Sequence, residues 1–305
     1  MSRHAQRAGR WPAKRSRTAR RPAREERAVT NYRHVDDWND AYANGSNIAG
    51  GERWPDAWVE PARAFRERLA GEGRAHLDQP YGEAPRNRYD LFLPEGEAAG
   101  LVVFVHGGFW LRLDKNFWSH LAAGAVESGY AVAMPSYTLC PHISIAGIVG
   151  EVGVAIAHAA ARTQGPVMLA GHSAGGHLVS RMVSATSPLA PDLRARIRNV
   201  VSISGVHDLR PIMRTAMNGD LRIDAEEARA QSPALLDPMP GARICCWVGG
   251  NERAEFLRQN ALLANAWTGC GAETACVVEP DRHHFNVIDG LAETGHALTR
   301  TLLTG

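Results

Sequence analysis

The sequence predicts an α/β fold in which a mainly parallel, twisted sheet is covered by helices on both faces. Short continuous apolar runs recur along the chain, a pattern typical of strands that are buried on both faces. Segments with helical periodicity separate these runs, and such alternation indicates a parallel sheet. The 305 residues suffice for one large domain, which we expect to span residues 31–305.

The start of the chain has a different composition. Residues 1–27 contain ten Arg or Lys residues and two Glu residues, a net charge of +8, whereas the whole chain carries +2. We predict a disordered basic leader over residues 1–30. A nucleic-acid-binding arm or an organelle transit peptide would have a similar composition, but we expect no nucleic-acid function. The leader has no apolar stretch of the kind that a secretion signal needs.

The composition also indicates which kinds of partner to expect and in which cellular compartment the protein resides. The five cysteines form no C-x-x-C pair and no zinc-ligand spacing, so we expect reduced thiols, mostly buried in strands, and no metal. No apolar run approaches the ~18 residues that a membrane span requires. We therefore expect a cytoplasmic protein without a membrane partner, and this composition is compatible with a homodimer.

Residues 36–73 are helical in pattern and rich in aromatic side chains. Trp38, Tyr42, Trp58 and Phe65 are separated mostly by multiples of three or four residues, and Pro55 is placed to open a helix. Because this segment precedes the first strand, we expect residues 31–86 to lie over the sheet. The aromatic side chains then serve either packing alone or a cap over the active site.

The remaining elements follow from periodicity and from Pro and Gly punctuation. Residues 88–93 alternate between polar and apolar side chains and predict a half-exposed edge strand. Further strands are expected at 101–105, 130–134, 167–170, 199–204, 243–248 and 274–278. Helices are expected at 115–128, 144–162, 174–186, 224–230, 252–267 and 286–303.

One stretch carries a chemical signature. The apolar run that ends at Ala170 leads into Gly171–His–Ser–Ala–Gly175, and a helical pattern follows. This strand, turn and helix around G-x-S-x-G is the nucleophile elbow of α/β-hydrolases. Ser173 is the predicted nucleophile, and the backbone N–H of Ala174 is a predicted oxyanion donor.

A serine nucleophile needs a general base, because its hydroxyl is a poor nucleophile at its own pKa. In this fold the acid and then the histidine follow the serine along the chain, each on a loop after a strand. The loop after the last predicted strand contains His283 and His284. We expect His284 to be the base, with His283 as the alternative.

The second oxyanion donor is expected after an earlier strand. The buried run ending at Val105 continues into His106–Gly–Gly–Phe–Trp110, and glycines in such a loop let backbone N–H groups approach a carbonyl oxygen. Gly108 or Phe109 is the predicted donor that pairs with Ala174. We expect the substrate to contact His106, Gly107 and Trp110, with Phe109 and Trp110 lining an aromatic pocket.

Together, His106–Gly–Gly–Phe–Trp110 and Gly171–His–Ser–Ala–Gly–Gly–His177 resemble the arylformamidase, or kynurenine formamidase, branch of the α/β-hydrolases. This branch lies near the hormone-sensitive-lipase-like esterases. Weaker similarity extends over residues 32–290, for example at Ser204–Gly–Val–His–Asp–Leu209. The resemblance implies hydrolysis of N-formyl-L-kynurenine, or a similar aryl formamide, without a cofactor. A carboxylesterase for short acyl esters and a weakened hydrolase used for binding are the alternatives.

The acid of the triad departs from that family pattern. Where the family has an Asp shortly before Glu-Phe, this sequence has Asn251, and an amide in that role can cost ~10⁴-fold in turnover. Glu252, the next residue in the same predicted loop, is the expected acid. Asp208, at the end of the preceding strand, is the alternative.

Overall fold

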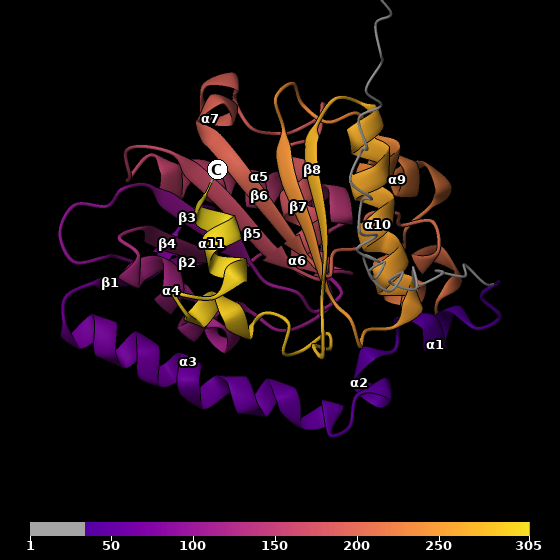
Figure 1. The fold of residues 1–305 in the computed structure, drawn as a ribbon, viewed down its shortest axis with the longest axis horizontal. Helices are drawn as coiled ribbons and strands as arrows, with labels where there is room; N and C mark the ends of the chain where they lie inside the picture. Colours follow the sequence, from indigo (N-terminus) through magenta and orange to yellow (C-terminus); the bar gives the residue numbers. More distant parts are fainter. Residues whose placement is uncertain (1–33, 305) are drawn as a thin grey trace, which may run out of the picture. The chain divides into compact units, whose positions relative to one another are not determined.

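The central sheet has the order β1-β2-β4-β3-β5-β6-β7-β8 in the computed structural model, which describes residues 34–304 (Figure 1). The predicted leader over residues 1–30 lies outside the described residues. Strands β1, β2 and β4 pair antiparallel, and the remaining neighbours pair parallel. The mainly parallel sheet is therefore confirmed.

The strands agree with the predicted apolar runs, and one further strand precedes them. Their bounds are β1 Ala75–Pro80, β2 Arg88–Phe92, β3 Leu101–Val105, β4 Ala131–Pro135, β5 Val167–His172, β6 Ile197–Ile203, β7 Arg243–Gly249 and β8 Glu273–Glu279. Strands β3, β5, β6, β7 and β8 run parallel to one another, so their carboxyl ends lie at one edge of the sheet. Open α/β sheets bind ligands at such an edge.

The prediction of an edge strand at residues 88–93 is wrong. β2 lies between β1 and β4, and its last four residues are buried. The sequence misleads because Asp90 looks like a solvent-facing residue in an alternating pattern. In the fold, Asp90 is buried beside the ammonium group of Lys115, so its charge is neutralised inside the protein.

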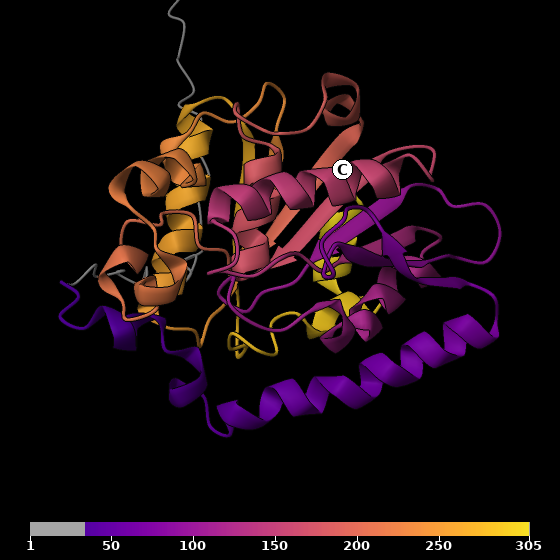
Figure 2. The same ribbon diagram turned by 180° about the vertical axis from the view of Figure 1, so that it is seen from behind.

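Helices cover both faces of the sheet (Figures 1 and 2). The core on one face includes side chains of α5, α6 and α10, and the core on the other face includes side chains of α3, α4 and α11. The helices are α1 Trp38–Tyr42, α2 Asn44–Asn47, α3 Trp54–Gly71, α4 Ala123–Glu127, α5 Ile145–Ala160, α6 Ala174–Met182, α7 Pro191–Arg196, α8 Asn218–Leu221, α9 Ala225–Ala230, α10 Ala254–Gly269 and α11 Ala297–Leu303.

Two predicted helices are broken. The segment 115–128 consists of two 3₁₀ turns and the short α4, because Trp118 leaves the helical region at φ −127° and ψ 13°. The segment 286–303 contains a 3₁₀ turn and then α11, whose amino end is capped by the ring of His296. None of the helices in residues 34–304 combines the length and apolarity that crossing a membrane takes.

The cysteines only partly follow the prediction. Cys245 and Cys246 are buried in β7, and Cys140 is buried in a turn, but Cys270 and Cys276 are exposed. Cys276 belongs to β8, which is the last strand in the order and is partly exposed along its length. All five thiols are free.

A buried ion pair between Lys115 and Asp90, extended by the exposed Asp78, holds the chain after β3 against the antiparallel strands. The Nζ atom of Lys115 lies 2.8 Å from Asp90 and 2.8 Å from Asp78, and the Lys115 side chain is 3% exposed. Charges removed from water in this way are stable only while they remain paired.

We predict that Lys115→Met lowers the free energy of unfolding by about 3–5 kcal/mol, because it leaves the Asp90 carboxylate buried without its cation. Urea unfolding measures the change. The matched control is Arg243→Met, which breaks an exposed ion pair with Glu273 and should cost less than about 1 kcal/mol. Equal effects of the two substitutions would contradict this account.

Candidate active site

Ser173 lies on a sharp turn between β5 and α6. Its backbone has φ 56° and ψ −116°, a conformation that is rare outside glycine and that costs free energy. The Ser173 N–H donates to the carbonyl oxygen of Ile203 at 2.8 Å, which holds the turn against β6. A Cβ atom at Gly175 would collide with the carbonyl oxygen of Val105, so only glycine lets α6 approach β3 this closely.

His284 is joined to Glu252. The Nδ1 atom of His284 lies 2.7 Å from Oε2 of Glu252, and both side chains are buried. The other carboxylate oxygen of Glu252 accepts from the hydroxyl of Ser204 at 2.5 Å and from the N–H of Gly249 at 2.9 Å. A carboxylate held this way fixes the ring orientation and leaves Nε2 of His284 free for proton transfer.

The other residues considered for these two roles lie elsewhere. Asn251 is exposed, and the carboxylate of Asp208 is bound by the guanidinium of Arg210 at 2.8 and 2.9 Å. The ring of His283 packs edge-on against Trp54 at 5.1 Å. The structure thus brings together Glu252 and His284, whereas Asp208 and His283 contact other side chains.

His172, the variable residue of the elbow, contacts the backbone of His284. Its Nε2 lies 2.8 Å from the carbonyl oxygen of His284. Burial and the nearby ring of His284 hold the pKa of His172 well below its usual value, so the ring is neutral. The neutral ring donates Nε2–H to this carbonyl and fixes the backbone of His284.

The loop after β3 lies against the elbow. Gly108, Phe109 and Trp110 all have positive φ, at 109°, 54° and 60°. A Cβ atom at Gly107 would lie 3.1 Å from Cβ of Ser173, so the loop backbone passes directly beside the predicted nucleophile. Two elements therefore flank Ser173, the loop after β3 and α6, which begins at Ala174. Both bring backbone N–H groups to this part of the site.

Two of the predicted substrate contacts do not reach the cavity. The Trp110 side chain is 0% exposed and packs edge-on against the ring of His177 on α6. His106 is 1% exposed and stacks on Tyr137 at 4.4 Å. The successive left-handed residues turn the chain so that Phe109 faces the cavity while Trp110 faces the core, which the sequence pattern could not reveal. Gly107 contacts the elbow.

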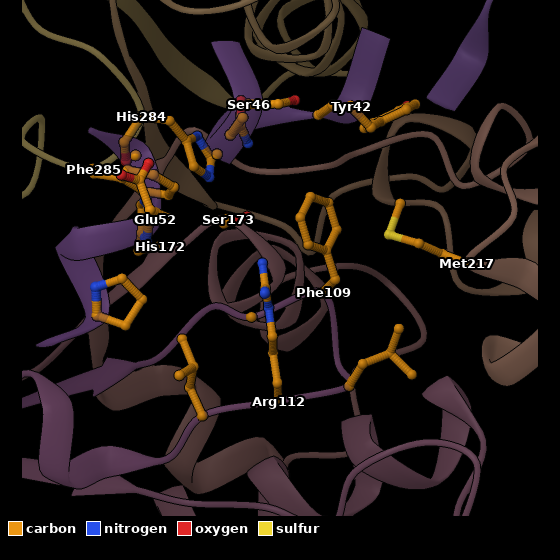
Figure 3. A pocket seen from close by; sticks show the side chains of 18 of the residues that line it. Tyr42, Ser46, Glu52, Phe109, Arg112, His172, Ser173, Met217, His284 and Phe285 are labelled. Atoms are coloured by element: carbon orange, nitrogen blue, oxygen red, sulfur yellow. The ribbon is translucent and has the colours of Figure 1, made fainter. Parts of the chain in front are cut away.

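A cavity of about 820 Å³ opens above Ser173 and is lined in part by the N-terminal helical segment (Figure 3). This active-site cavity is lined by Asn39, Tyr42, Ala43, Asn44, Gly45, Ser46, Gly51, Glu52, Pro55, Trp58, Gly108, Phe109, Leu111, Arg112, Leu113, Trp118, His172, Ser173, Met217, His284 and Phe285. Aromatic rings from three separate parts of the chain thus surround the predicted nucleophile and base.

Sequence reasoning missed two features of this cavity. Arg112 enters it from the loop after β3, and Met217 enters it from the segment after β6. The position of Arg112, two residues after the H-G-G-F-W motif, was the only signal available for it. Within residues 34–304, no hydrogen bond joins the Ser173 hydroxyl to the His284 ring. In unliganded hydrolases this contact often tightens only when substrate binds.

No group of three His, Cys, Asp or Glu side chains in residues 34–304 has the arrangement of a metal site. The fold is that of the α/β-hydrolases, a class of hydrolytic enzymes.

Comparisons with known proteins agree. The BD-FAE family model matches residues 89–238. A kynurenine formamidase of Danio rerio is 29% identical over 257 residues, which cover 81% of this chain and 87% of the relative. The crystal structure of a candidate thioesterase from a Silicibacter species has 47% identity and a TM-score of 0.83, covering 87% of this chain and 98% of that one. An esterase of Pyrobaculum calidifontis, 18% identical, has a TM-score of 0.62, with 82% and 89% coverage, and shows the shared fold.

The chain is an α/β-hydrolase that is similar to kynurenine formamidases. It is a hydrolase.

We predict that Glu252→Gln lowers turnover by about 10⁴-fold, because an amide neither stabilises the imidazolium nor holds the productive tautomer. Steady-state kinetics on any hydrolysed substrate measure the loss, and thermal unfolding checks that the variant folds. The matched control is Asn251→Ala in the neighbouring, exposed position, which should leave turnover unchanged. A large loss of turnover in Asn251→Ala together with a small loss in Glu252→Gln would contradict the role of Glu252 and would show that Asn251 interacts with the base instead.

Three buried histidines near the site predict a pH dependence of stability. Burial lowers the pKa of His106 to about 4 and the pKa values of His177 and His207 to about 3. As pH falls below about 6.5, the unfolded chain binds protons that the folded protein does not bind, so stability falls. Each histidine should cost on the order of 2 kcal/mol at about pH 5. Urea unfolding at about pH 7.5 and about pH 5 measures this, and equal midpoints would contradict it.

Proposed function

We propose that this hydrolase uses Ser173 as its nucleophile, His284 as its general base and Glu252 as the acid that orients the base. The observation that carries the proposal is the 2.7 Å contact of Glu252 with His284, which lines the same cavity as Ser173. The strained backbone of Ser173 supports it, because a nucleophile elbow holds its serine in this conformation.

The proposed reaction proceeds through an acyl-enzyme. Oγ of Ser173 attacks the acyl carbon while Nε2 of His284 takes its proton, and the negative charge develops on the former carbonyl oxygen. N–H groups of Ala174 and of Gly108 or Phe109 stabilise that oxygen. His284 then gives the proton to the leaving amine, and the bond between the acyl carbon and nitrogen breaks. A water molecule, deprotonated by His284, attacks the ester and releases the acid and Ser173.

The proposed substrate is N-formyl-L-kynurenine or a similar aryl formamide, and the products are the amine and formate. Similarity to kynurenine formamidases over 81% of the chain supports this substrate class. The cavity is lined by Trp58, Phe109, Trp118 and Phe285, which suits an aryl group. The formyl group is the smallest acyl group, and we propose that Phe109, which lines the cavity next to Gly108, restricts longer acyl groups.

Hydrolysis of short-chain esters or thioesters is the second candidate function. The specific observation in its favour is the 47% identical Silicibacter structure, which is described as a candidate thioesterase. The same triad and oxyanion loop would serve all three acyl bonds, so only the cavity walls distinguish them.

We further propose that the N-terminal segment caps the active site. Its residues Tyr42, Ser46 and Trp58 line the cavity, and the hydroxyl of Tyr42 donates to Glu255 of α10 at 2.7 Å. We propose a cytoplasmic location, since all five cysteines are free.

We predict a higher kcat/KM for N-formyl-L-kynurenine than for p-nitrophenyl acetate, p-nitrophenyl butyrate or acetyl-coenzyme A. Formation of kynurenine is followed by absorbance, and Ser173→Ala should lower kcat by about 10³-fold or more. Preference for butyrate or for the thioester, without detectable deformylation, would overturn the proposed substrate. Undiminished activity of Ser173→Ala would overturn the proposed nucleophile.

A further inference from the structure

Two charged side chains outside the proposed triad line the active-site cavity. Among the described residues that line it, Arg112 carries the one permanent positive charge and Glu52 the one carboxylate. The histidine behind the base, His172, is kept neutral by burial, and burial also raises the pKa of Tyr42, which therefore stays neutral. A cavity built for a neutral ester would need neither charge.

Arg112 belongs to the oxyanion loop itself. A Cβ atom built on Gly108 would collide with the carbonyl oxygen of Arg112, and it would lie 3.4 Å from the Cγ atom of Arg112. The stem of the side chain therefore starts beside the predicted oxyanion donor. Figure 3 shows the guanidinium extending into the cavity that contains Ser173.

Within residues 34–304 the guanidinium of Arg112 has no hydrogen-bonded or ionic partner. Other arginines near the site are paired: Arg210 binds Asp208, Arg258 binds Glu255 and Arg253 binds Asp40. A guanidinium presents a planar fork of donors that fits a carboxylate with two hydrogen bonds. Arg112 is thus free to bind an anion that arrives with the substrate.

Glu52 supplies the complementary charge. It lines the same cavity, and its only ionic partner among the described residues is the exposed Arg53, at 3.5 Å. Such an exposed pair contributes little and leaves the carboxylate available to a ligand. One positive and one negative group in a single cavity match a ligand that carries both charges, as a free amino acid does.

We infer that Arg112 binds the α-carboxylate of the substrate and that Glu52 faces its ammonium group. The site then selects aryl formamides that carry a zwitterionic amino-acid end over neutral formamides and esters of similar size. This inference rests on the proposed function for the reacting bond, but it concerns the opposite end of the substrate. Arg112 is a specificity-determining residue in this account, and the triad acts without it.

Three formamides that share the aryl formamide end and lose the charged groups in turn test the inference. N-formyl-L-kynurenine carries both charges, N-formylkynuramine lacks the carboxylate, and 2-formamidoacetophenone lacks both. The wild-type kcat/KM should be about 10–100-fold higher for the first than for the second, which is the usual contribution of a hydrogen-bonded charge. Arg112→Gln should remove this preference, mainly through KM, and Arg112→Lys should restore part of it.

A neutral substrate and a distant arginine serve as controls. Hydrolysis of p-nitrophenyl acetate, which has no carboxylate, gives the baseline for each variant: Arg112→Gln should lower kcat/KM for N-formyl-L-kynurenine about tenfold more than it lowers kcat/KM for p-nitrophenyl acetate. Arg198→Gln removes the same charge at the exposed amino end of β6, away from the carboxyl edge of the sheet, and should change none of these rates. If Arg112→Gln lowers kcat/KM by the same factor for all substrates, Arg112 only supports the loop, and this result would overturn the inference. So would a wild-type enzyme that does not distinguish the three formamides.

A binding measurement separates failure of this inference from failure of the proposed function. Inhibition of p-nitrophenyl acetate hydrolysis by L-kynurenine and by kynuramine requires no deformylation. L-kynurenine should inhibit about tenfold more strongly, and the difference should vanish in Arg112→Gln. Equal inhibition by the two compounds would overturn the inference even if the enzyme deformylates N-formyl-L-kynurenine. Stronger inhibition by free coenzyme A, lost in Arg112→Gln, would instead assign Arg112 to a phosphate group.

Discussion

The active site depends on the close approach of α6 to the ends of β3 and β5. Gly175 stands where any side chain would collide with Val105, and this contact fixes the first turn of the helix over the sheet. The chain can reach that position only through the positive φ of Ser173. Strain at one residue is tolerated because β6 and the oxyanion loop surround it, and it points the hydroxyl into the cavity rather than along the helix.

The parallel order of the sheet explains how distant residues meet at Ser173. The loop with the proposed oxyanion donors follows β3, Glu252 follows β7 and His284 follows β8, and all these strands end at the same edge. Ser204, at the end of β6, adds a hydrogen bond to Glu252. The N-terminal segment contacts this arrangement, because Arg253, next to Glu252, pairs with Asp40 of α1. This ion pair therefore joins the N-terminal segment, which forms part of the cavity wall, to the loop that carries Glu252.

The sheet, the sharp turn at Ser173 and the position of His284 beside the same cavity were predictable because each depends on local sequence: apolar runs, a glycine-rich turn and a histidine after the last strand. The acid was harder, since Glu252 and Asp208 both follow a strand and only side-chain geometry decides between them. Arg210 beside Asp208 removes that residue from the choice. The edge-strand error has a similar cause, because pairing of Asp90 with Lys115 cannot be deduced from alternation. The burial of Trp110 depends on backbone angles, which motif spacing does not report.

The central claim is that Ser173 is an activated nucleophile, and covalent labelling tests it most directly. The protein is incubated with a fluorophosphonate, and intact-mass and peptide mass spectrometry locate the adduct. This account predicts one adduct per chain, on the peptide that contains Ser173, with none in Ser173→Ala and much slower labelling in Glu252→Gln. Absence of labelling in the folded wild-type protein, or an adduct on another residue, would contradict it.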